Sequence, residues 1–248
     1  MVNKILFGDC RETLKTIDTK AQMCVTSPPY YGLRNYGGED KQIGMEQTPE
    51  EYIEQLVDVF RSVRDVLTDD GTLWLNIGDT YYNYRSDGNY PKQTVSRTKQ
   101  DLPDFSPVRG NKLHNLKSKD LIGIPWMLAF ALRADGWWLR QDIIWNKPNP
   151  MPESVKDRCT KSHEYIFLLS KSKNYYYDNE AIKEPVKQDW GTRDRTNGKY
   201  HNPGSGLAPH SGLSKSYDRK NKRSVWTVTN KPYKGAHFAC FPPDLIEP

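Results

Sequence analysis

The chain has 248 residues, 36% of them hydrophobic, so it can bury one substantial core, and its pattern favours one domain with insertions over two equal domains. No segment approaches the roughly 18 consecutive apolar residues of a membrane span, and the N-terminus lacks a signal-peptide pattern, so we expect a soluble, cytoplasmic protein. The cysteines show no CxxC spacing, which predicts reduced thiols and no metal site. They are Cys10, Cys24, Cys159 and Cys240.

The formal net charge of +5 is distributed unevenly along the chain. Residues 183–234 contain 12 Lys or Arg against 4 Asp or Glu, and residues 84–117 contain 7 against 3. Both segments are rich in residues that favour loops, and 183–234 has almost no apolar period. Basic inserts in an otherwise acidic chain are typical of a nucleic-acid-binding protein, because phosphate neutralisation supplies most sequence-independent affinity. Ordinary solvated loops are the alternative.

Hydrophobic periodicity predicts strands that alternate with helices. In chain order we expect strand 4–7, a helical stretch through Leu14 and Ile17, strand 21–25, a helix from the capping box at 48–51 to the Asp-Asp-Gly stop at 69–71, strand 72–77, helix 121–134, strands 138–145, 164–170 and 223–228, and the start of a helix at 242–246. This alternation indicates an α/β fold with a parallel-type sheet. The strands at 138–145 and 164–170 are expected to form a hairpin-like pair added at its edge.

A proline-stiffened loop is predicted directly after the strand at 21–25. Its sequence, residues 26–31, is Thr-Ser-Pro-Pro-Tyr-Tyr. The two prolines fix φ and lack N–H donors, so nearby carbonyls stay free to accept hydrogen bonds, and the tyrosines offer flat faces beside them. An aminated ring would fit such a loop, which is therefore the predicted reaction centre. A plain surface turn is the alternative for a match of four residues.

Several segments, spread over most of the chain, resemble one protein family. They are ILFGDC (5–10), TSPPYYGLRNYG (26–37), GTLWLNIGD (71–79), KDLIGIPW (119–126), GWWLRQDIIWNKPNPMPESVKDR (136–158), HEYIFLLSKS (163–172), NKRSVWTV (221–228) and GAHFACFPPDLIEP (235–248). This set resembles the S-adenosylmethionine-dependent DNA amino-methyltransferases of β-type motif order, especially their prophage-like group. The resemblance implies a Rossmann-like methyltransferase sheet with flanking helices, a circularly permuted motif order and a loop-rich target-recognition insert.

The resemblance also implies the cofactor and the partners. S-adenosyl-L-methionine would be the methyl donor and double-stranded DNA the substrate of a bacterial or phage-encoded enzyme, with a restriction endonuclease as a candidate partner. Ser27 and the carbonyl of Pro28, supported by Pro29, would accept hydrogen bonds from the exocyclic amine of an extruded base, and Tyr30 would stack on that base. Ser27 favours the N4 amine of cytosine, whereas aspartate is usual for N6 of adenine, which stays open as the alternative.

Further binding residues follow from the same resemblance. Asp9 would contact the adenine end of the cofactor, although an N-cap for the helix beginning at Cys10 is an equally physical role. Asp79 would line the cofactor or base pocket, or only end a strand. The other expected cofactor contacts are His237, Phe241 and Pro242, and the expected substrate contacts are Tyr31, Arg34, Asn146, Lys147 and Arg223.

This interpretation divides the chain into a catalytic half with the SPPY motif (1–83), a basic mobile insert (84–117), the remainder of the catalytic sheet (118–182), a target-recognition region (183–234) and the start of an incomplete cofactor-binding half (235–248). The family pattern calls for a strand and a glycine-rich FxGxG-type turn after 242–246, and the sequence contains neither. We expect a truncated form. A complementary polypeptide that supplies these strands, and a nucleic-acid-binding remnant without turnover, are the alternatives.

Two expectations complete the sequence interpretation. A sheet without its cofactor-binding strands would expose an apolar edge, which predicts self-association as a homodimer. A methyltransferase that acts on a protein amide is a further alternative, but it would carry NPPY in place of SPPY, and the basic inserts also argue against it.

Overall fold

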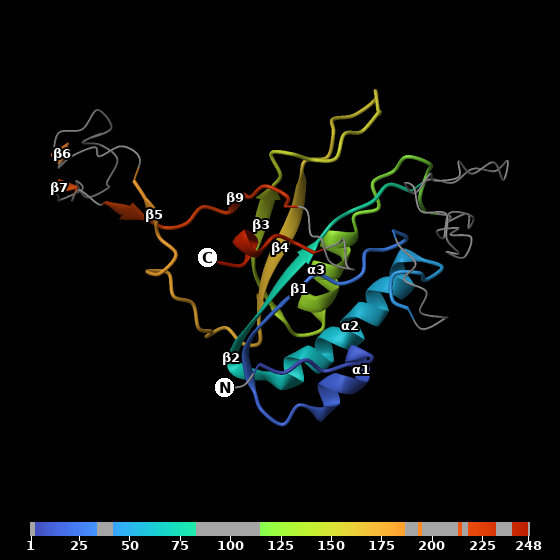
Figure 1. Ribbon diagram of the computed structural model, residues 1–248, viewed down its shortest axis with the longest axis horizontal. Helices are drawn as coiled ribbons and strands as arrows, with labels where there is room; N and C mark the ends of the chain where they lie inside the picture. Colours follow the sequence, from blue (N-terminus) through green and yellow to red (C-terminus); the bar gives the residue numbers. More distant parts are fainter. Residues whose placement is uncertain are drawn as a thin grey trace, which may run out of the picture. The chain divides into compact units, whose positions relative to one another are not determined.

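The computed structural model describes residues 3–33, 42–82, 115–186, 193–194, 213–214, 218–231 and 240–247. The chain folds into two units (Figure 1). The main unit comprises Met1–Tyr176 and Ser224–Glu247, and the small unit comprises Tyr177–Arg223. Residues 84–114 of the expected mobile insert, and more than half of 183–234, lie outside the described residues.

The main unit is built on a five-stranded sheet with the order β1-β2-β4-β3-β9 (Figure 1). Its strands are β1 (Ala21–Thr26), β2 (Leu67–Ile77), β3 (Trp138–Asn146), β4 (His163–Ser170) and β9 (Val225–Thr227). β1 is parallel to β2 and β3 to β9, whereas β4 is antiparallel to both of its neighbours. The sheet is therefore mixed, and the parallel arrangement expected from the sequence holds for two pairs of strands only.

The position of the β3–β4 pair differs from the prediction. The two strands are antiparallel, as expected, but β4 lies between β2 and β3, and β9 rather than this pair forms the sheet edge. The apolar run from Ile166 to Leu169 explains the central position, because these consecutive side chains are all buried and need cover on both faces of the sheet. The hairpin-like edge was wrong for this reason.

The helix α2 (Pro49–Val66) begins as the capping box predicts. The Thr48 hydroxyl accepts from the Glu51 backbone N–H at 3.2 Å, and the Glu51 carboxylate accepts from the Thr48 N–H at 3.2 Å. The helix ends before the Asp-Asp-Gly at 69–71, which lies within β2. Leu67 has extended dihedrals, pairs with Ala21 and is buried, so strand pairing begins at the first residue after the helix.

The remaining helices of the main unit are α1 (Cys10–Thr13), the 3-10 turn η1 (Leu14–Thr16), α3 (Ile124–Ala134) and the 3-10 turn η3 (Pro243–Leu245). α3 starts later than predicted, because Leu121 bridges to Tyr81 and Gly123, at φ +88°, turns the chain into the helix. Within the described ranges, no helix combines the length and the apolar character that crossing a bilayer requires.

Residues 4–7 do not form the expected strand. They pair with none of the described strands, and the side chains of Ile5 and Phe7 are 78% and 89% exposed. A strand is stable only when its backbone groups pair with a neighbour, and β1, the edge strand on that side of the sheet order, pairs with β2 alone among the described strands. Apolar residues next to Gly8-Asp9 were therefore insufficient to predict a strand.

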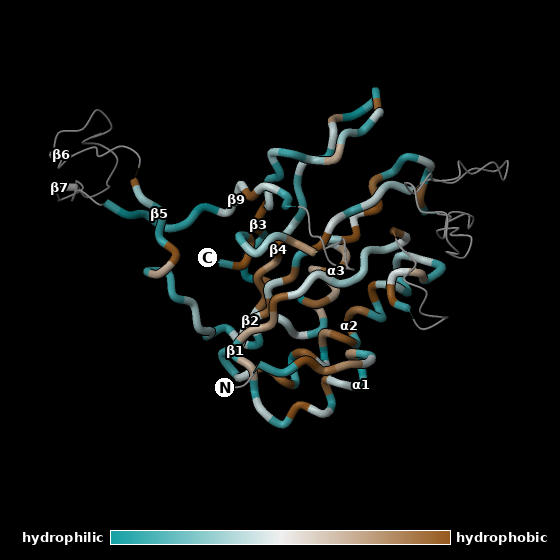
Figure 2. The backbone as a smooth tube through the Cα atoms, viewed as in Figure 1, coloured by the Kyte–Doolittle hydropathy of each residue, from teal (hydrophilic) through white to brown (hydrophobic). Residues whose placement is uncertain are grey.

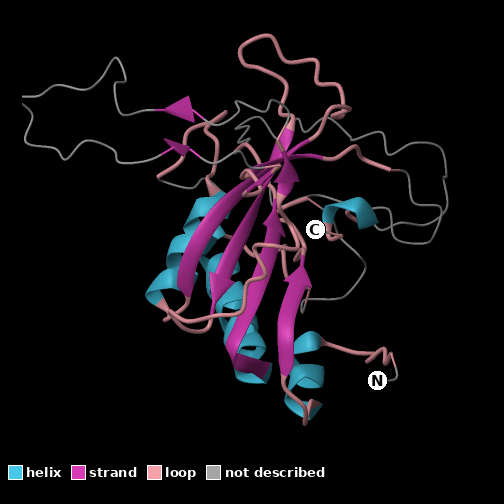
Figure 3. Cartoon of the chain, turned by 90° about the vertical axis from the view of Figure 1, so that its left-hand side faces the viewer, coloured by secondary structure: helices cyan, strands magenta, loops and turns pink. Residues whose placement is uncertain are grey.

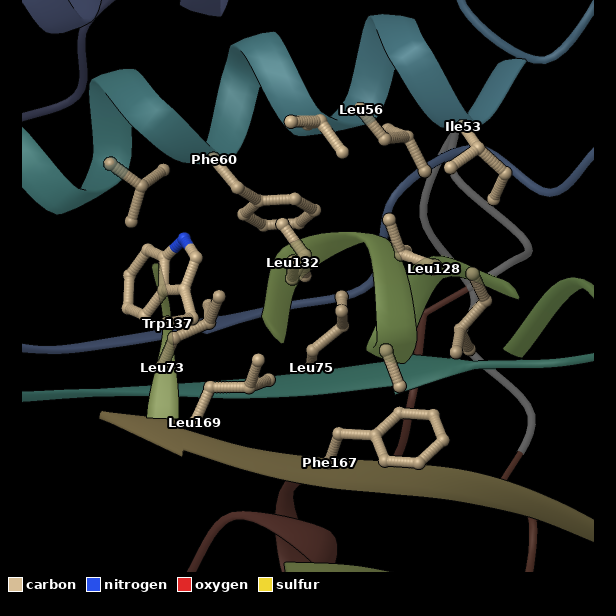
Figure 4. Packing of buried hydrophobic residues seen from close by; sticks show 14 of the residues in the cluster. Ile53, Leu56, Phe60, Leu73, Leu75, Leu128, Leu132, Trp137, Phe167 and Leu169 are labelled. Atoms are coloured by element: carbon tan, nitrogen blue, oxygen red, sulfur yellow. The ribbon is translucent and has the colours of Figure 1, made fainter. Parts of the chain in front are cut away.

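A hydrophobic core lies between the sheet and the helices α2 and α3 (Figure 4). Phe60 and Leu56 of α2 face Leu132 of α3, and Leu75 of β2 and Phe167 of β4 close the cluster from the sheet. Apolar stretches of the chain accordingly follow the strands and helices of this unit (Figure 2). Burial of these side chains is the main source of stability, at roughly 1.5–3 kcal/mol for each large side chain.

The opposite face of the sheet carries a second, smaller cluster formed by Ile143, Trp145, Ile166 and Leu245, with Phe241 packed against it. The two long helices lie along one face of the sheet only (Figure 3). The second face is the one that carries polar side chains at the ends of its strands, as described below.

The small unit contains two short antiparallel ladders. β5 (Glu184–Pro185) pairs with β8 (Arg219–Lys220), and β6 (Arg193–Asp194) pairs with β7 (Leu213–Ser214). The loop-dominated character expected for 183–234 stays a prediction, because more than half of this range lies outside the described residues. β9, although it falls within that range, belongs to the main sheet.

Candidate active site

Four strand ends meet at one side of the main sheet. This is the edge formed by the strand ends, not an outer strand such as β9. β1 and β2 are parallel, so their carboxyl ends lie together, and the antiparallel pairing of β4 places its first residues and the last residues of β3 at the same edge. This topology brings together the SPPY loop after β1, residues 76–79 at and just after the end of β2, Lys147 after β3 and Glu164 in β4. Ligand sites of open α/β sheets lie at such edges.

Strand alternation decides which side chains face one another there. Glu164 pairs with Trp145, and Asn76 pairs with Ile166, and directly opposed residues point to the same face of a sheet. Trp145 and Ile166 belong to the second cluster, so Asn76 and Glu164 lie on the face that does not carry α2 and α3.

The carboxylate of Glu164 is the centre of a hydrogen-bond network. The Tyr30 hydroxyl donates to Glu164 Oε2 at 2.7 Å, and Asn76 Nδ2 donates to the same oxygen at 3.1 Å. The Lys147 ammonium forms an ion pair with Oε1 and lies 4.1 Å from the centroid of the Trp145 ring. Because the Lys147 and Glu164 side chains are only 15% and 18% exposed, each depends on the other for charge compensation.

Tyr30 is held tightly between this network and β2. A Cβ atom built on Gly78 would lie 2.7 Å from Tyr30 Cε2, so glycine is required for this close approach. Burial, together with the negative charge of Glu164, raises the pKa of Tyr30 well above its ordinary value. The hydroxyl therefore stays protonated at neutral pH and remains a donor to Glu164. The Ser27 hydroxyl lies 3.4 Å from it.

The carbonyls of the two prolines differ in their partners. The Tyr52 hydroxyl, from the buried face of α2, donates to the Pro29 carbonyl at 2.7 Å. Within the described part of the chain, no hydrogen bond reaches the Pro28 carbonyl. Free carbonyls were expected at both prolines, and the structure leaves that of Pro28 to accept from a ligand.

Two of the expected substrate contacts have structural roles. Tyr31 is buried in the core, donates its hydroxyl to the Gln47 carbonyl at 3.3 Å and packs against Tyr52 with ring centroids 5.4 Å apart. Asn146 Nδ2 donates to Thr227 Oγ1 at 3.2 Å and so joins β3 to β9. Tyr31 therefore anchors the residue after the SPPY motif in the core, a structural role that the motif alone does not predict.

Of the remaining predicted residues, Arg223 and Asp9 have other partners than this network. Arg223 lies in the small unit, where its Nε donates to Glu184 Oε2 at 2.9 Å. Arg34 and His237 lie outside the described residues. Asp9 caps α1, because its carboxylate accepts from the Arg11 N–H at 2.9 Å and from the Arg11 guanidinium, which confirms the N-cap alternative. Its expected cofactor contact stays a prediction.

Only some of the residues expected to hold S-adenosylmethionine lie in the described part of the chain, because His237 falls outside it. Phe241 packs against the second cluster, and Pro242 is buried beside η3. Asp9 offers a carboxylate, but it already accepts from Arg11. The residues of the Glu164 network and the SPPY loop would face the target base and not the cofactor.

Comparison with known proteins assigns the family. A family model described as DNA methylase, of the N6/N4 type, matches residues 21–248. The chain belongs to this DNA methylase family. The resemblance that the sequence motifs suggested is thereby confirmed.

Relatives of known type cover nearly the whole chain. It is 49% identical over 240 residues to the Type II methyltransferase M.SmaI of Serratia marcescens, covering 96% of this chain and 71% of that protein. It is 46% identical over 242 residues to the Type II methyltransferase M.Cfr9I of Citrobacter freundii, covering 97% of this chain and 69% of that protein.

A solved structure supports the fold. The PvuII DNA methyltransferase (cytosine-N4-specific) matches with a TM-score of 0.52 and 14% identity, over 92% of this chain and 58% of that chain. The Rossmann-like methyltransferase sheet expected from the motifs is thus confirmed, and the chain spans a little more than half of this structural relative.

Sequence reasoning missed Glu164, Asn76 and Gly78 as parts of this candidate site. Glu164 stands immediately before an apolar strand, in the segment HEYIFLLSKS, and a carboxylate at the start of a central strand was the available signal. A half-buried ammonium, that of Lys161, also lies at this edge and donates to the Asp79 carbonyl at 3.3 Å. Burial lowers the pKa of Lys161.

Asp79 lies just after the end of β2, and its expected place in the cofactor or base pocket stays a prediction. Its carboxylate accepts from the N–H groups of Thr80 at 2.9 Å, Gly123 at 3.0 Å and Ile124 at 3.1 Å, and so caps α3.

Replacing Asp79 with alanine should lower the free energy of unfolding by about 1–2 kcal/mol, because three backbone donors lose their acceptor. Urea denaturation would measure this loss. The matched change Asp58→Ala, which removes an exposed carboxylate paired with Arg61, should cost about 0.5 kcal/mol or less. Equal losses in the two variants would contradict the capping role.

The cysteines differ in accessibility. Burial raises the pKa of the Cys24 thiol to about 11, so almost none of it is thiolate at neutral pH, whereas Cys159 is exposed. We expect iodoacetamide to label Cys159 well before Cys24, as followed by peptide mass spectrometry. Faster labelling of Cys24 would show that β1 opens readily in solution.

Proposed function

We propose that this methylase transfers a methyl group from S-adenosylmethionine to the exocyclic N4 amine of cytosine at specific sites in DNA. The observation that carries the proposal is the pair of acceptors at the end of β1: the Ser27 hydroxyl beside the Tyr30–Glu164 network, and the Pro28 carbonyl, which no described residue occupies. The family membership and the Type II relatives support the same reaction class.

These acceptors suit the chemical difficulty of the reaction. The lone pair of an exocyclic amine is delocalised into its ring, so the nitrogen is a poor nucleophile. Ser27 and the Pro28 carbonyl would each accept one N–H of the amine and draw the nitrogen toward tetrahedral geometry, which localises the lone pair for attack. The donor, when bound, supplies an activated methyl group on a sulfonium. The protein's own work is orientation and electrostatics, and no covalent enzyme intermediate is needed.

The choice of cytosine rests on Ser27. A neutral hydroxyl takes the place that a carboxylate occupies in the adenine-N6 type of motif. The N6 amine of adenine is the alternative, since the same two acceptors could orient it.

DNA binding would come from the basic segments. We propose 183–234, with Arg223, as the target-recognition region and 84–117 as the insert that faces DNA, because these ranges carry 12 and 7 basic residues against 4 and 3 acidic ones. The Type II methyltransferase relatives support site-specific modification, and a restriction endonuclease stays a candidate partner.

The decisive experiment is to incubate the chain with mixed-sequence DNA and S-adenosylmethionine, and to quantify methylated nucleosides by mass spectrometry. We expect N4-methylcytosine. N6-methyladenine would keep the mechanism and overturn the base. Salt-dependent DNA binding without either product would favour the alternative of a nucleic-acid-binding module. In that case the basic segments would bind DNA without any methyl transfer.

A further inference from the structure

We propose that Glu164 sets the hydrogen-bond direction of the SPPY loop, so that the Ser27 hydroxyl presents only its lone pairs to the target amine. Glu164 would thus be a positioning residue that acts through Tyr30. The inference rests on the proposed function, because it concerns how Ser27 serves as an acceptor there.

The first step concerns the proton of Tyr30. An ionised carboxylate only accepts hydrogen bonds, and a phenol has one proton to donate. Tyr30 gives that proton to Glu164 Oε2 at 2.7 Å, while Asn76 Oδ1, a neutral acceptor, lies farther away at 3.3 Å. The shorter, charge-assisted bond is the stronger one, so the Tyr30 proton is committed to Glu164.

The second step concerns the proton of Ser27. Because Tyr30 has no second proton, its oxygen can only accept from the Ser27 hydroxyl, 3.4 Å away. This distance is longer than that of an ordinary O–H···O bond, as catalytic hydrogen bonds often are before substrate binds. With its proton turned toward Tyr30, Ser27 has lone pairs left for an incoming N–H. The reverse orientation would direct a hydroxyl proton against the protons of the amine.

The third step concerns what holds the Glu164 carboxylate in place. The Lys147 ammonium pairs with Oε1, and Asn76 Nδ2 donates to Oε2 at 3.1 Å while also donating to the Tyr165 carbonyl at 3.1 Å. These donors come from β2 and from the end of β3, so the carboxylate joins three strands to the SPPY loop. With its proton directed to Tyr30, Ser27 can act toward the target amine only as a hydrogen-bond acceptor, as an aspartate carboxylate would.

A double-mutant cycle tests the proposal. The single-turnover rate of methyl transfer at saturating DNA would be measured for the full chain and for Glu164→Gln, Tyr30→Phe and the double variant. Each single change should lower the rate by about 10- to 100-fold, and the double variant should be no slower than the slower single variant, because both changes break one chain of donors. Glu54→Gln, on the exposed surface of α2, is the matched control and should leave the rate unchanged.

Additive losses in the cycle would overturn the proposal, because they would mean that Glu164 acts independently of Tyr30. A second readout needs no activity: the Cζ resonance of Tyr30 in protein with ¹³C-labelled tyrosine, assigned by its absence in Tyr30→Phe. We expect this resonance to shift in Glu164→Gln and not in Glu54→Gln. An unshifted resonance would equally overturn the inference, whereas failure of the wild-type chain to methylate DNA would count against the proposed function alone.

Discussion

Replacing Ser27 with alanine should lower the single-turnover rate of methyl transfer by about 100- to 1000-fold, the usual cost of removing one hydrogen-bonding group that acts on the transition state. Alanine removes an acceptor from the amine without changing the fold around it, since the backbone of the loop is held by Tyr52 at the Pro29 carbonyl. DNA affinity should be unchanged, because the phosphate contacts would come from the basic segments.

The measurement compares rapid-quench rates with DNA-binding isotherms on the same preparations. Ser62→Ala, in α2 on the helix-covered side of the sheet, is the matched control, because it also deletes one hydroxyl and should leave both quantities as in the parent chain. Full methyl transfer by Ser27→Ala would contradict the assignment of the SPPY loop as the reaction centre.

Local signals in the sequence predicted the parts of this structure that depend on neighbouring residues. The capping box at Thr48 placed the start of α2 correctly, since its two residues, Thr48 and Glu51, are only three positions apart. The SPPY loop was placed correctly at the end of a strand for the same reason, because proline restricts its own backbone and that of the preceding residue.

Such local signals could not predict contacts between residues that are far apart in the sequence. Tyr30 and Glu164 are 134 positions apart, and they meet only because β4 enters the sheet beside β2, an order that the strand pattern does not encode. The strand expected at 4–7 failed for a related reason, because an apolar run becomes a strand only beside a partner. The site could therefore be predicted as a motif, but not as a network.

The close contact between Gly78 and Tyr30 makes a second large effect predictable. Gly78→Ala should lower methyl transfer by about 100-fold and the free energy of unfolding by about 1–3 kcal/mol, because the new Cβ would lie 2.7 Å from Tyr30 Cε2 and 3.2 Å from Cδ2. The Tyr30 ring cannot move away easily, since it is rigid and its hydroxyl is hydrogen-bonded to Glu164. Displacing it would break the path from Ser27 to the carboxylate.

The same substitution in a Tyr30→Ala background separates this cause from others. Without the ring, the added methyl group has space, so Gly78→Ala should then cost about 0.5 kcal/mol or less in urea denaturation. An equal cost in both backgrounds would place the strain in the backbone just after β2 and not in the tyrosine. If this loss of stability disappears in the Tyr30→Ala background, one contact serves both the fold and the chemistry. The absence of a side chain at Gly78 lets the Tyr30 ring pack closely, and this position brings the Tyr30 hydroxyl to Glu164.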